Sequence, residues 1–153
     1  MTGSEQLQVF ASTCVTDLHD IDFAVLVGSG GGFTWRFSDF LIELNGSTTI
    51  ASYLAESEGG VSEFKSTPLL LYERSTRVEE LIDYATKMEF FNIELDPPKS
   101  TFAKHIAIKH PLYGVKRVIW SEDAVPIAPA GLVLLDREIR FFLAESFTQE
   151  FGH

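Results

Sequence analysis

The sequence predicts a single α+β domain, residues 1–153, with a mainly antiparallel sheet and two to four helices. Three observations favour this fold class. The chain has 153 residues, a usual length for one domain. Hydrophobic residues make up 45% of it and include 13 Phe, which is enough apolar material for one core. Its apolar patterns cluster several strands together and set helices between the clusters, whereas parallel sheets alternate strands and helices strictly.

The N-terminal part of the chain predicts one short helix and then a strand. Residues 4–13 fit a short helix with Ser4 as its N-cap. Residues 21–28, IDFAVLVG, form an apolar run rich in Val and Ile and predict a buried strand. The glycine-rich stretch Ser29–Gly32 predicts a flexible turn after that strand.

Residues 33–44 alternate apolar and polar side chains, as a half-buried strand does. The alternation changes phase by one residue near Ser38 and Asp39, which predicts a β-bulge at that point. Asn45-Gly46 supplies the positive φ angles of a type I′ turn, so it marks a hairpin or the end of a strand. After this turn, the apolar spacing of residues 50–54 favours a helix.

The clearest helical pattern lies in the middle of the chain. Residues 68–73 predict a buried strand, and residues 75–90 then predict a helix with Ser75 as its N-cap. Charged residues spaced i, i+4 follow one face of this helix. The opposite face is apolar and consists of Val78, Leu81, Ile82 and Ala85.

The C-terminal third predicts a hairpin, a further strand and a closing helix. Residues 102–109 and 115–120 read as two strands joined through residues 110–114. Residues 132–135 predict another apolar strand, and Asp136 can cap the helix that follows. The apolar side of that helix is expected to consist of Ile139, Phe142, Leu143 and Phe147.

Negative charge is concentrated in the first 63 residues. The whole chain carries 22 acids against 12 Lys and Arg, a net charge of −10. Nine of these acids and one of these bases, Arg36, lie in the first 63 residues, a net charge of −8. Such a field repels nucleic acid and anionic membranes and speeds encounter with a basic partner, although excess acid also keeps a protein soluble.

The sequence indicates a cytoplasmic protein without a cofactor or a metal. No Lys or Arg precedes Arg36, so the basic start of a secretory signal is missing, and no apolar run approaches the ~18 residues that a membrane span needs. Cys14 is the single cysteine, which excludes an internal disulfide and a cysteine-rich zinc site. His19 is nearby, but no third group orients the pair, which favours a buried structural thiol over a nucleophile.

Gly28–Gly32, after an apolar strand, is the one stretch that suggests nucleotide binding. No Lys follows as in a phosphate loop, and Phe33 replaces the third glycine of the dinucleotide motif. The strand, Gly28-Ser29 and the later Ser38-Asp39 resemble the opening of the nucleotidyltransferase superfamily, in which two carboxylates separated by one residue hold a catalytic metal. Leu41 stands where the second carboxylate belongs, so the resemblance implies an incomplete metal site.

The histidines indicate no shared site. His19, Asp20 and Asp22 could offer ligands to a metal, but no spacing typical of a structural zinc site accompanies them, so we interpret them as a polar loop before a strand. His105 and His110 are five residues apart, which on one strand places them on opposite faces.

The segment Pro97–Ser121 contains bases and aromatic residues but no acid. Bases interleaved with aromatic residues can bind nucleic acid, but the net charge of the chain opposes that reading. We expect these bases to face acids within the fold, and to form no continuous basic surface. They are Lys99, Lys104, Lys109, Lys116 and Arg117.

Three functions remain open. The first is a small non-enzymatic binding protein that neutralises a basic partner protein; in size and acidity the chain resembles immunity proteins, antitoxins and phage-encoded inhibitors. The alternatives are a small-ligand or nucleotide-binding enzyme that uses the Gly28–Gly32 turn, and a structural or assembly subunit with a Phe-rich contact. For the first function we expect a protein partner, no nucleic acid and no membrane, and a surface of acids with aromatic anchors. The candidate partner-binding residues are Asp17, Asp20, Asp22, Trp35, Tyr53, Glu56, Glu58 and Glu63.

Overall fold

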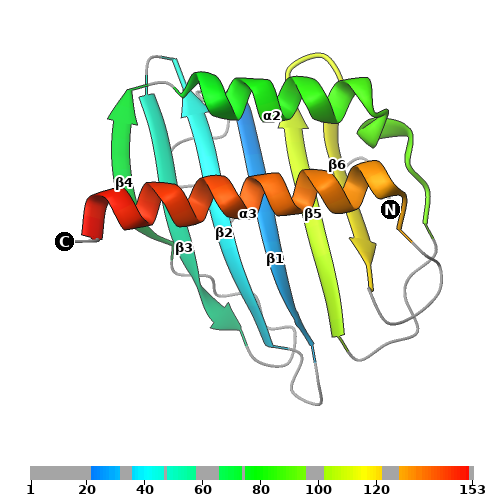
Figure 1. The fold of residues 1–153 in the computed structure, drawn as a ribbon, viewed down its shortest axis with the longest axis horizontal. Helices are drawn as coiled ribbons and strands as arrows, with labels where there is room; N and C mark the ends of the chain where they lie inside the picture. Colours follow the sequence, from blue (N-terminus) through cyan, green and yellow to red (C-terminus); the bar gives the residue numbers. More distant parts are fainter. Residues whose placement is uncertain are drawn as a thin grey trace.

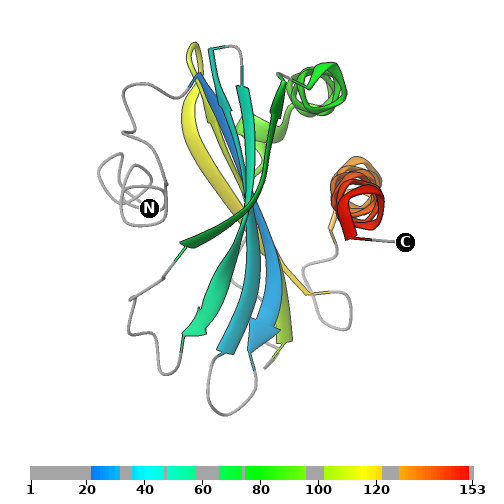
Figure 2. The same ribbon diagram turned by 90° about the vertical axis from the view of Figure 1, so that its left-hand side faces the viewer.

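Six strands form one sheet in the part of the chain that the computed structural model describes, which is residues 22–31, 36–46, 48–57, 66–73, 75–95, 102–121 and 128–151. Two α-helices lie together on one face of this sheet (Figures 1 and 2). The strands are β1 (Phe23–Gly31), β2 (Arg36–Asn45), β3 (Thr48–Ser57), β4 (Ser66–Glu73), β5 (Phe102–His110) and β6 (Gly114–Trp120). The helices are α2 (Thr76–Lys87), the short 3-10 helix η2 (Phe90–Asn92) and α3 (Ala130–Phe151).

All neighbouring strands of the sheet are antiparallel, and their order is β4-β3-β2-β1-β5-β6. The strand β1 therefore lies in the interior of the sheet, between β2 and β5. The chain adds β2, β3 and β4 on one side of β1, crosses the sheet as α2, and then adds β5 and β6 on the other side (Figure 1). This arrangement confirms the predicted α+β class with an antiparallel sheet.

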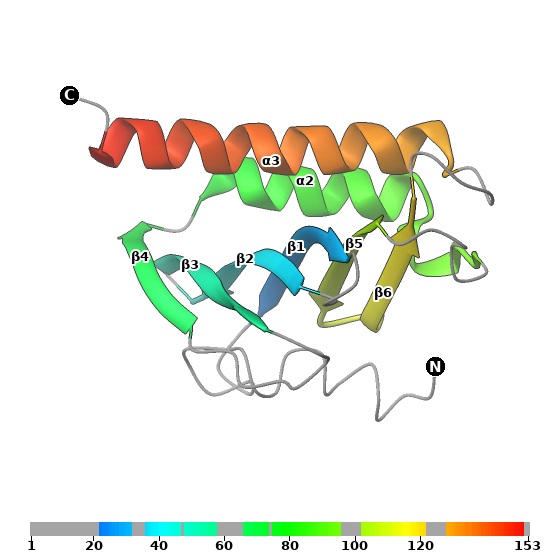
Figure 3. The ribbon, with the colours of Figure 1, turned by 90° about the horizontal axis from the view of Figure 1, so that it is seen from below.

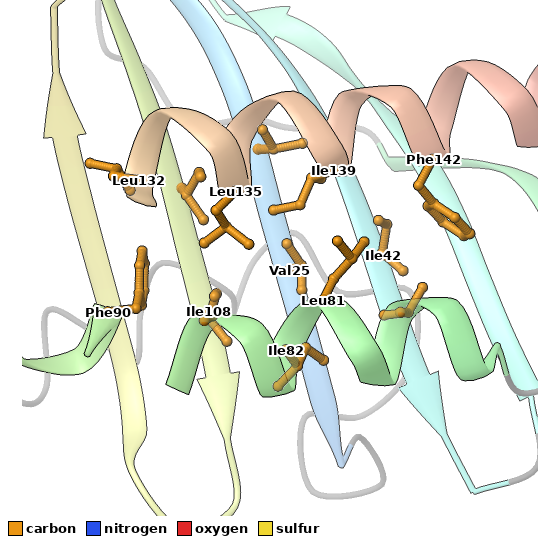
Figure 4. Close-up of a cluster of buried hydrophobic side chains, with 14 of the residues drawn as sticks. Val25, Ile42, Leu81, Ile82, Phe90, Ile108, Leu132, Leu135, Ile139 and Phe142 are labelled. Carbon is orange, nitrogen blue, oxygen red and sulfur yellow. The ribbon is translucent and has the colours of Figure 1, made fainter. Parts of the chain in front are cut away.

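The main core lies between the two helices and the sheet. Alternate residues of β1, β2 and β5 point toward the helices, and every third or fourth residue of each helix points back (Figure 4). Each fully buried Leu or Ile contributes about 1.5–3 kcal/mol relative to its exposed state. Among the fully buried members are Ile42, Leu44, Ile106, Ile108, Leu132, Leu135 and Ile139.

The opposite face of the sheet is buried as well. Leu26, Leu41, Ile50 and Ala107 lie on that face and are at most 7% exposed. The central strands are therefore buried on both sides, although the face opposite the helices also holds the buried polar residues Glu43 and His105. This explains why residues 24–27 form an unbroken apolar run instead of an alternating one.

The strand β4 and the helix α2 confirm a strand and then a helix in this part of the chain, although α2 ends at Lys87 and does not extend to Phe90 as predicted. The hydroxyl of Ser75 accepts a hydrogen bond from the backbone N–H of Val78 at 3.2 Å, as an N-cap does. The backbone N–H of Ser75 donates to the hydroxyl of Thr49 at 2.7 Å, and that hydroxyl donates to the carbonyl of Glu73 at 3.0 Å. The start of α2 is thus fixed to the buried part of β3, and its predicted apolar face is buried.

Two other local predictions are confirmed in β2. The pairing of β2 with β3 changes register between Phe37 and Asp39, where the phase of the sequence predicts a bulge. Asn45 is the last residue of β2 and pairs with Thr48 of β3, and Gly46 directly after it has a φ of +57°. The end of β2 was therefore predictable from the sequence, whereas the second strand of the hairpin was not.

The predicted turn at Ser29–Gly32 is wrong for its described residues, because Ser29, Gly30 and Gly31 belong to β1. Ser29 pairs with Ser38 of β2 on one side and with Lys104 of β5 on the other. Glycine is unfavourable in an isolated strand, but pairing on both sides overrides this local preference.

The predicted helix after Gly46 is also wrong, since residues 48–57 form β3. Asn45-Gly46 is a tight turn, so the residues after it lie beside β2 and pair with it; Phe40 pairs with Tyr53, for example. A helical spacing of three apolar residues does not outweigh this pairing.

The predicted strand at residues 132–135 and the cap at Asp136 are wrong, because α3 begins at Ala130. Leu132, Leu135 and Ile139 are spaced by three and four residues and all point toward the sheet (Figure 4). A short apolar run does not distinguish a buried strand from a buried helix by its pattern alone. The predicted apolar side of the closing helix is confirmed at Ile139, Phe142 and Leu143; the side chain of Phe147 lies outside the described part.

The helix predicted for residues 4–13 lies outside the described residues.

Candidate partner-binding surface

Among the predicted partner-binding residues, Asp22 is the one whose side chain the structure describes, and it is exposed. Tyr53 and Glu56 lie in β3, where the structure describes the backbone and not these side chains. Asp17, Asp20, Trp35, Glu58 and Glu63 lie outside the described residues, so the predicted gathering of these acids on one surface stays a prediction.

Asp22 lies at the end of the sheet where β5 turns into β6. Its backbone N–H donates to the carbonyl of Leu44 at 2.9 Å, which extends the ladder between β1 and β2. On the other side of β1, where it pairs with β5, Ala24 is opposite Lys109. Because antiparallel partners run in opposite directions, the position of Asp22 is level with Pro111, the first residue of the β5–β6 turn.

The β5–β6 turn carries two strongly exposed side chains. Leu112 is 82% exposed and Tyr113 is 58% exposed. Gly114 ends the turn with a φ of +78°, a conformation that favours glycine. The backbone N–H of Leu112 donates to Nδ1 of His110 at 3.0 Å, so the last residue of β5 holds the turn in place.

Four rings from distant parts of the sequence meet below this turn, and we call them the aromatic cluster: Phe23, Phe91, His110 and Tyr113. Tyr113 stacks on Phe91 with ring centroids 5.2 Å apart and an interplanar angle of 28°. His110 lies 4.7 Å from Tyr113, 5.2 Å from Phe23 and 5.7 Å from Phe91. These contacts hold Tyr113 in one orientation while more than half of its surface stays exposed.

His110 is neutral at neutral pH in this setting. Its Nδ1 accepts a hydrogen bond, so the ring proton belongs on Nε2. Partial burial among the rings lowers the pKa of His110 below its ordinary value. Protonation of Nδ1 removes the acceptor for Leu112, so the geometry of the turn depends on the neutral ring.

Three exposed acids lie within three residues of Phe23 or Phe91 in the sequence. Glu89 and Glu94 are exposed and lie two and three residues from Phe91, on which Tyr113 stacks. Asp22 borders the turn from the side of β1. We call Leu112, Tyr113, Asp22, Glu89 and Glu94 the tip surface; it combines an apolar centre with three carboxylates. Such a surface suits a partner with basic groups around an apolar patch.

Tyr113 was not among the predicted anchors, because it lies in the segment that contains no acid. The available signal was its position in the five-residue connection, residues 110–114, between two predicted strands. An aromatic side chain in such a short turn has no strand face to occupy, so it projects from the sheet.

The bases of the segment Pro97–Ser121 form no continuous basic surface in its described part. Strand alternation places Lys104 and Lys116 on the face that the helices cover, and Lys109 and Arg117 on the other. Nζ of Lys104 lies 3.7 Å from Oδ2 of Asp136 on α3. The predicted pairing with an acid of the same fold is seen for Lys104. It stays a prediction for Lys109, Lys116 and Arg117, and Lys99 lies outside the described residues.

Asp136 and Arg140 connect α3 to the glycine-rich part of β1. Nε of Arg140 donates to Oδ1 of Asp136 at 2.9 Å, and an NH2 group of Arg140 donates to the carbonyl of Gly28 at 3.1 Å. The segment Gly28–Gly31 is thus paired on both sides as a strand and contacted by α3 at Gly28. This arrangement differs from an open loop whose amides converge on a phosphate.

No group of three His, Cys, Asp or Glu with the geometry of a metal site occurs among the described residues. His105 is buried on the face of the sheet opposite the helices, whereas His110 contacts η2, so the two lie on opposite faces as predicted. No helix in the described ranges has the length and apolar character that crossing a membrane requires.

Comparison of the chain with models of protein families finds no match, and a search of curated proteins finds no similar sequence either.

Proposed function

We propose that this chain is a small non-enzymatic binding protein whose tip surface engages a partner protein with a basic surface. The observation that carries the proposal is Tyr113, which is 58% exposed and yet held by stacking on Phe91. Exposed, preoriented aromatic side chains are typical anchors of protein interfaces, because little rotamer entropy is lost when they are buried.

The charge of the chain supports a basic partner. The net charge is −10, and the three acids of the tip surface are exposed. Charges of this kind speed encounter with an oppositely charged protein, while the buried rings determine how slowly the complex dissociates. In the proposal, Asp17, Asp20, Glu56, Glu58 and Glu63 add to the same field, and Trp35 and Tyr53 are further candidate anchors.

The proposed biological role is inhibition: the protein neutralises its partner in the cytoplasm, as immunity proteins and antitoxins do. The proposal that the protein is an inhibitor rests on its size, its acidity and the absence of a recognisable catalytic motif in the sequence. It requires that the partner has an activity of its own that the complex blocks.

The first test identifies the partner and the surface together. Affinity capture from cells, followed by binding kinetics, should recover a basic protein. The substitution Tyr113→Ala should raise the Kd about tenfold or more, since anchors of this type contribute at least ~2 kcal/mol. The matched control is Phe102→Ala at the other end of β5, where the ring is 62% exposed, and it should leave the Kd nearly unchanged.

A charge-reversal experiment separates the effect of the acids on the association rate from the effect of the aromatic anchor on the dissociation rate. Reversal of Glu89 and Glu94 to Lys should slow association by about tenfold at low salt, and 1 M salt should remove most of that difference because the Debye length falls to ~3 Å. Dissociation should change little. If Phe102→Ala weakens the complex as much as Tyr113→Ala, or the captured partner is acidic, the proposal is wrong.

A further inference from the structure

Two cations on the helix side of the sheet share one buried carboxylate. Nε of Arg140 donates to Oδ1 of Asp136 at 2.9 Å, and Nζ of Lys104 lies 3.7 Å from Oδ2 of the same carboxylate. The side chain of Asp136 is buried, whereas those of Lys104 and Arg140 are partly exposed to solvent. We call Lys104 and Arg140 the cation pair. Together with Asp136 it carries one net positive charge, on a chain whose net charge is −10.

The cation pair lies next to strand ends that neither helix covers. The strands extend beyond α3 on the side away from α2, where β1 ends and β5 begins (Figures 1, 2 and 3). Arg140 contacts this part of the sheet, because its Nη2 donates to the carbonyl of Gly28 at 3.1 Å. Glu138 is two residues from Arg140, so it lies on the opposite flank of α3, and it pairs with Arg77 of α2. The flank of α3 that carries Arg140 therefore faces the uncovered strands.

The surface of β1 beside the cation pair is formed by small residues. Ser29 is opposite Lys104 of β5, and Gly31 is opposite Phe102. Strand alternation places all four on the helix side of the sheet, as it does Val25 and Val27. Glycine in a paired strand often marks a position that a ligand approaches closely. The glycine-rich end of β1 can therefore serve a ligand as a strand, and not as a phosphate-binding loop.

An exposed ring and a buried N–H adjoin Lys104. Phe102 is two residues away on the same face of β5, a spacing of about 7 Å, and is 62% exposed. Trp120 of β6 is opposite Lys104 and is buried, and its indole N–H has no hydrogen-bond partner among the described residues. A buried donor without an acceptor costs free energy, and an oxyanion beside Lys104 offers this donor an acceptor.

We propose that the cation pair and Phe102 bind a small aromatic anion, namely a carboxylate or a phosphate monoester attached to a flat ring. The oxyanion accepts charge-assisted hydrogen bonds from Lys104 and Arg140. The ring lies over the small residues of β1 and packs against Phe102. Asp136 holds both cations near each other before the ligand binds, which lowers the cost of ordering them.

This site is separate from the tip surface. The tip surface adjoins His110 at the end of β5, whereas Phe102 and Lys104 belong to its start. The inference therefore goes beyond the proposed function and does not depend on it. It gives the small-ligand hypothesis a specific position at the glycine-rich end of β1.

Nuclear magnetic resonance titration of the full chain with phenyl phosphate and with benzoate measures affinity and position together. Binding should shift the backbone amides of Ser29, Phe102 and Lys104 and the indole N–H of Trp120. At least one of the two aromatic anions should bind about tenfold more tightly than its counterpart without a ring, inorganic phosphate or acetate. The tighter of the two identifies the oxyanion. Benzyl alcohol has the ring without the charge and should bind about tenfold more weakly than that anion.

Matched substitutions assign the binding to this site. Lys104→Gln should raise the Kd of the tighter anion about tenfold or more, since it removes a charge-assisted hydrogen bond. The control is Lys116→Gln, which removes the same charge on the same face, opposite Ile108 and about 13 Å along the sheet, and should leave the Kd nearly unchanged. Phe102→Ala alters an exposed side chain and should weaken the aromatic anion but not inorganic phosphate or acetate.

Four results would overturn the site. They are no binding of either aromatic anion to the wild-type chain at millimolar concentration, shifts confined to other parts of the chain, equal weakening by Lys104→Gln and Lys116→Gln, and binding of benzyl alcohol as tight as that of the anions.

Discussion

Tyr113 and Phe141 are almost equally exposed, at 58% and 56%, but their surroundings differ. Tyr113 stacks on Phe91 and contacts His110, so its own chain fixes its orientation. Phe141 has no aromatic contact among the described residues and projects from a regular helix. Equal exposure therefore occurs in two different settings: Tyr113 is preoriented, as the anchor of an interface is, whereas Phe141 is not held by a neighbouring ring.

The largest expected effect separates the two faces of α3. Ile139→Ala should lower the free energy of unfolding by about 2–5 kcal/mol, because it opens a cavity in the main core. Phe141→Ala, two residues away, should change it by no more than about 0.5 kcal/mol. Urea unfolding of both variants measures the difference. Similar losses in both would mean that Phe141 stabilises the fold, and the comparison with Tyr113 would then fail.

A smaller effect distinguishes the two exposed rings. Tyr113→Ala should lower the free energy of unfolding by about 1 kcal/mol, because it removes the stacking on Phe91 and the contact with His110. The Phe141→Ala variant, measured by urea unfolding in the same way, is the control. A Tyr113→Ala variant as stable as the wild type would show that the aromatic cluster contributes no stability and does not hold the ring in place.

The smallest effect is a pH dependence that belongs to the tip surface alone. Partial burial lowers the pKa of His110 below 6.5, so the unfolded chain binds the proton more readily than the folded one. Its contribution to stability is complete above pH 6.5 and is lost as the pH falls through the lower pKa of the folded state. Asn can accept the hydrogen bond from Leu112 and does not titrate, so His110→Asn should remove this part of the pH dependence. Unfolding curves between pH 5 and pH 8 measure it; identical curves for both proteins would contradict the assignment.

Elements with complete local signals were predictable from the sequence. The helix α2 has a cap at Ser75, one apolar face and charged residues opposite, and all three signals agree. The end of β2 has Asn45-Gly46, and the bulge has its phase change near Ser38. None of these signals depends on a distant part of the chain.

The elements that were predicted wrongly depend on contacts with residues far away in the sequence. The glycines of β1 are strand residues because β2 and β5 pair with them on both sides, which no local pattern encodes. The start of α3 is helical because Leu132 and Leu135 find one apolar surface made by the sheet and α2. Tertiary contacts decide such apolar segments, and their local preferences are weak.

Only part of the candidate site was predictable from the sequence. The excess of acids predicted exposed carboxylates, and Asp22, which is in the tip surface, is exposed. The apolar centre of the tip surface was missed, because the orientation of Tyr113 depends on Phe91 and His110, which are respectively 22 and three residues away in the sequence. The sequence showed an aromatic residue in a turn but not the ring on which it stacks.

Hydrogen exchange of the full chain with and without its captured partner tests the central claim most directly. The account predicts slower exchange of backbone amides in the β5–β6 turn and in η2 on binding, with unchanged exchange in α3. Protection confined to α3, or to strands away from the tip surface, would contradict the assignment of the tip surface to partner binding.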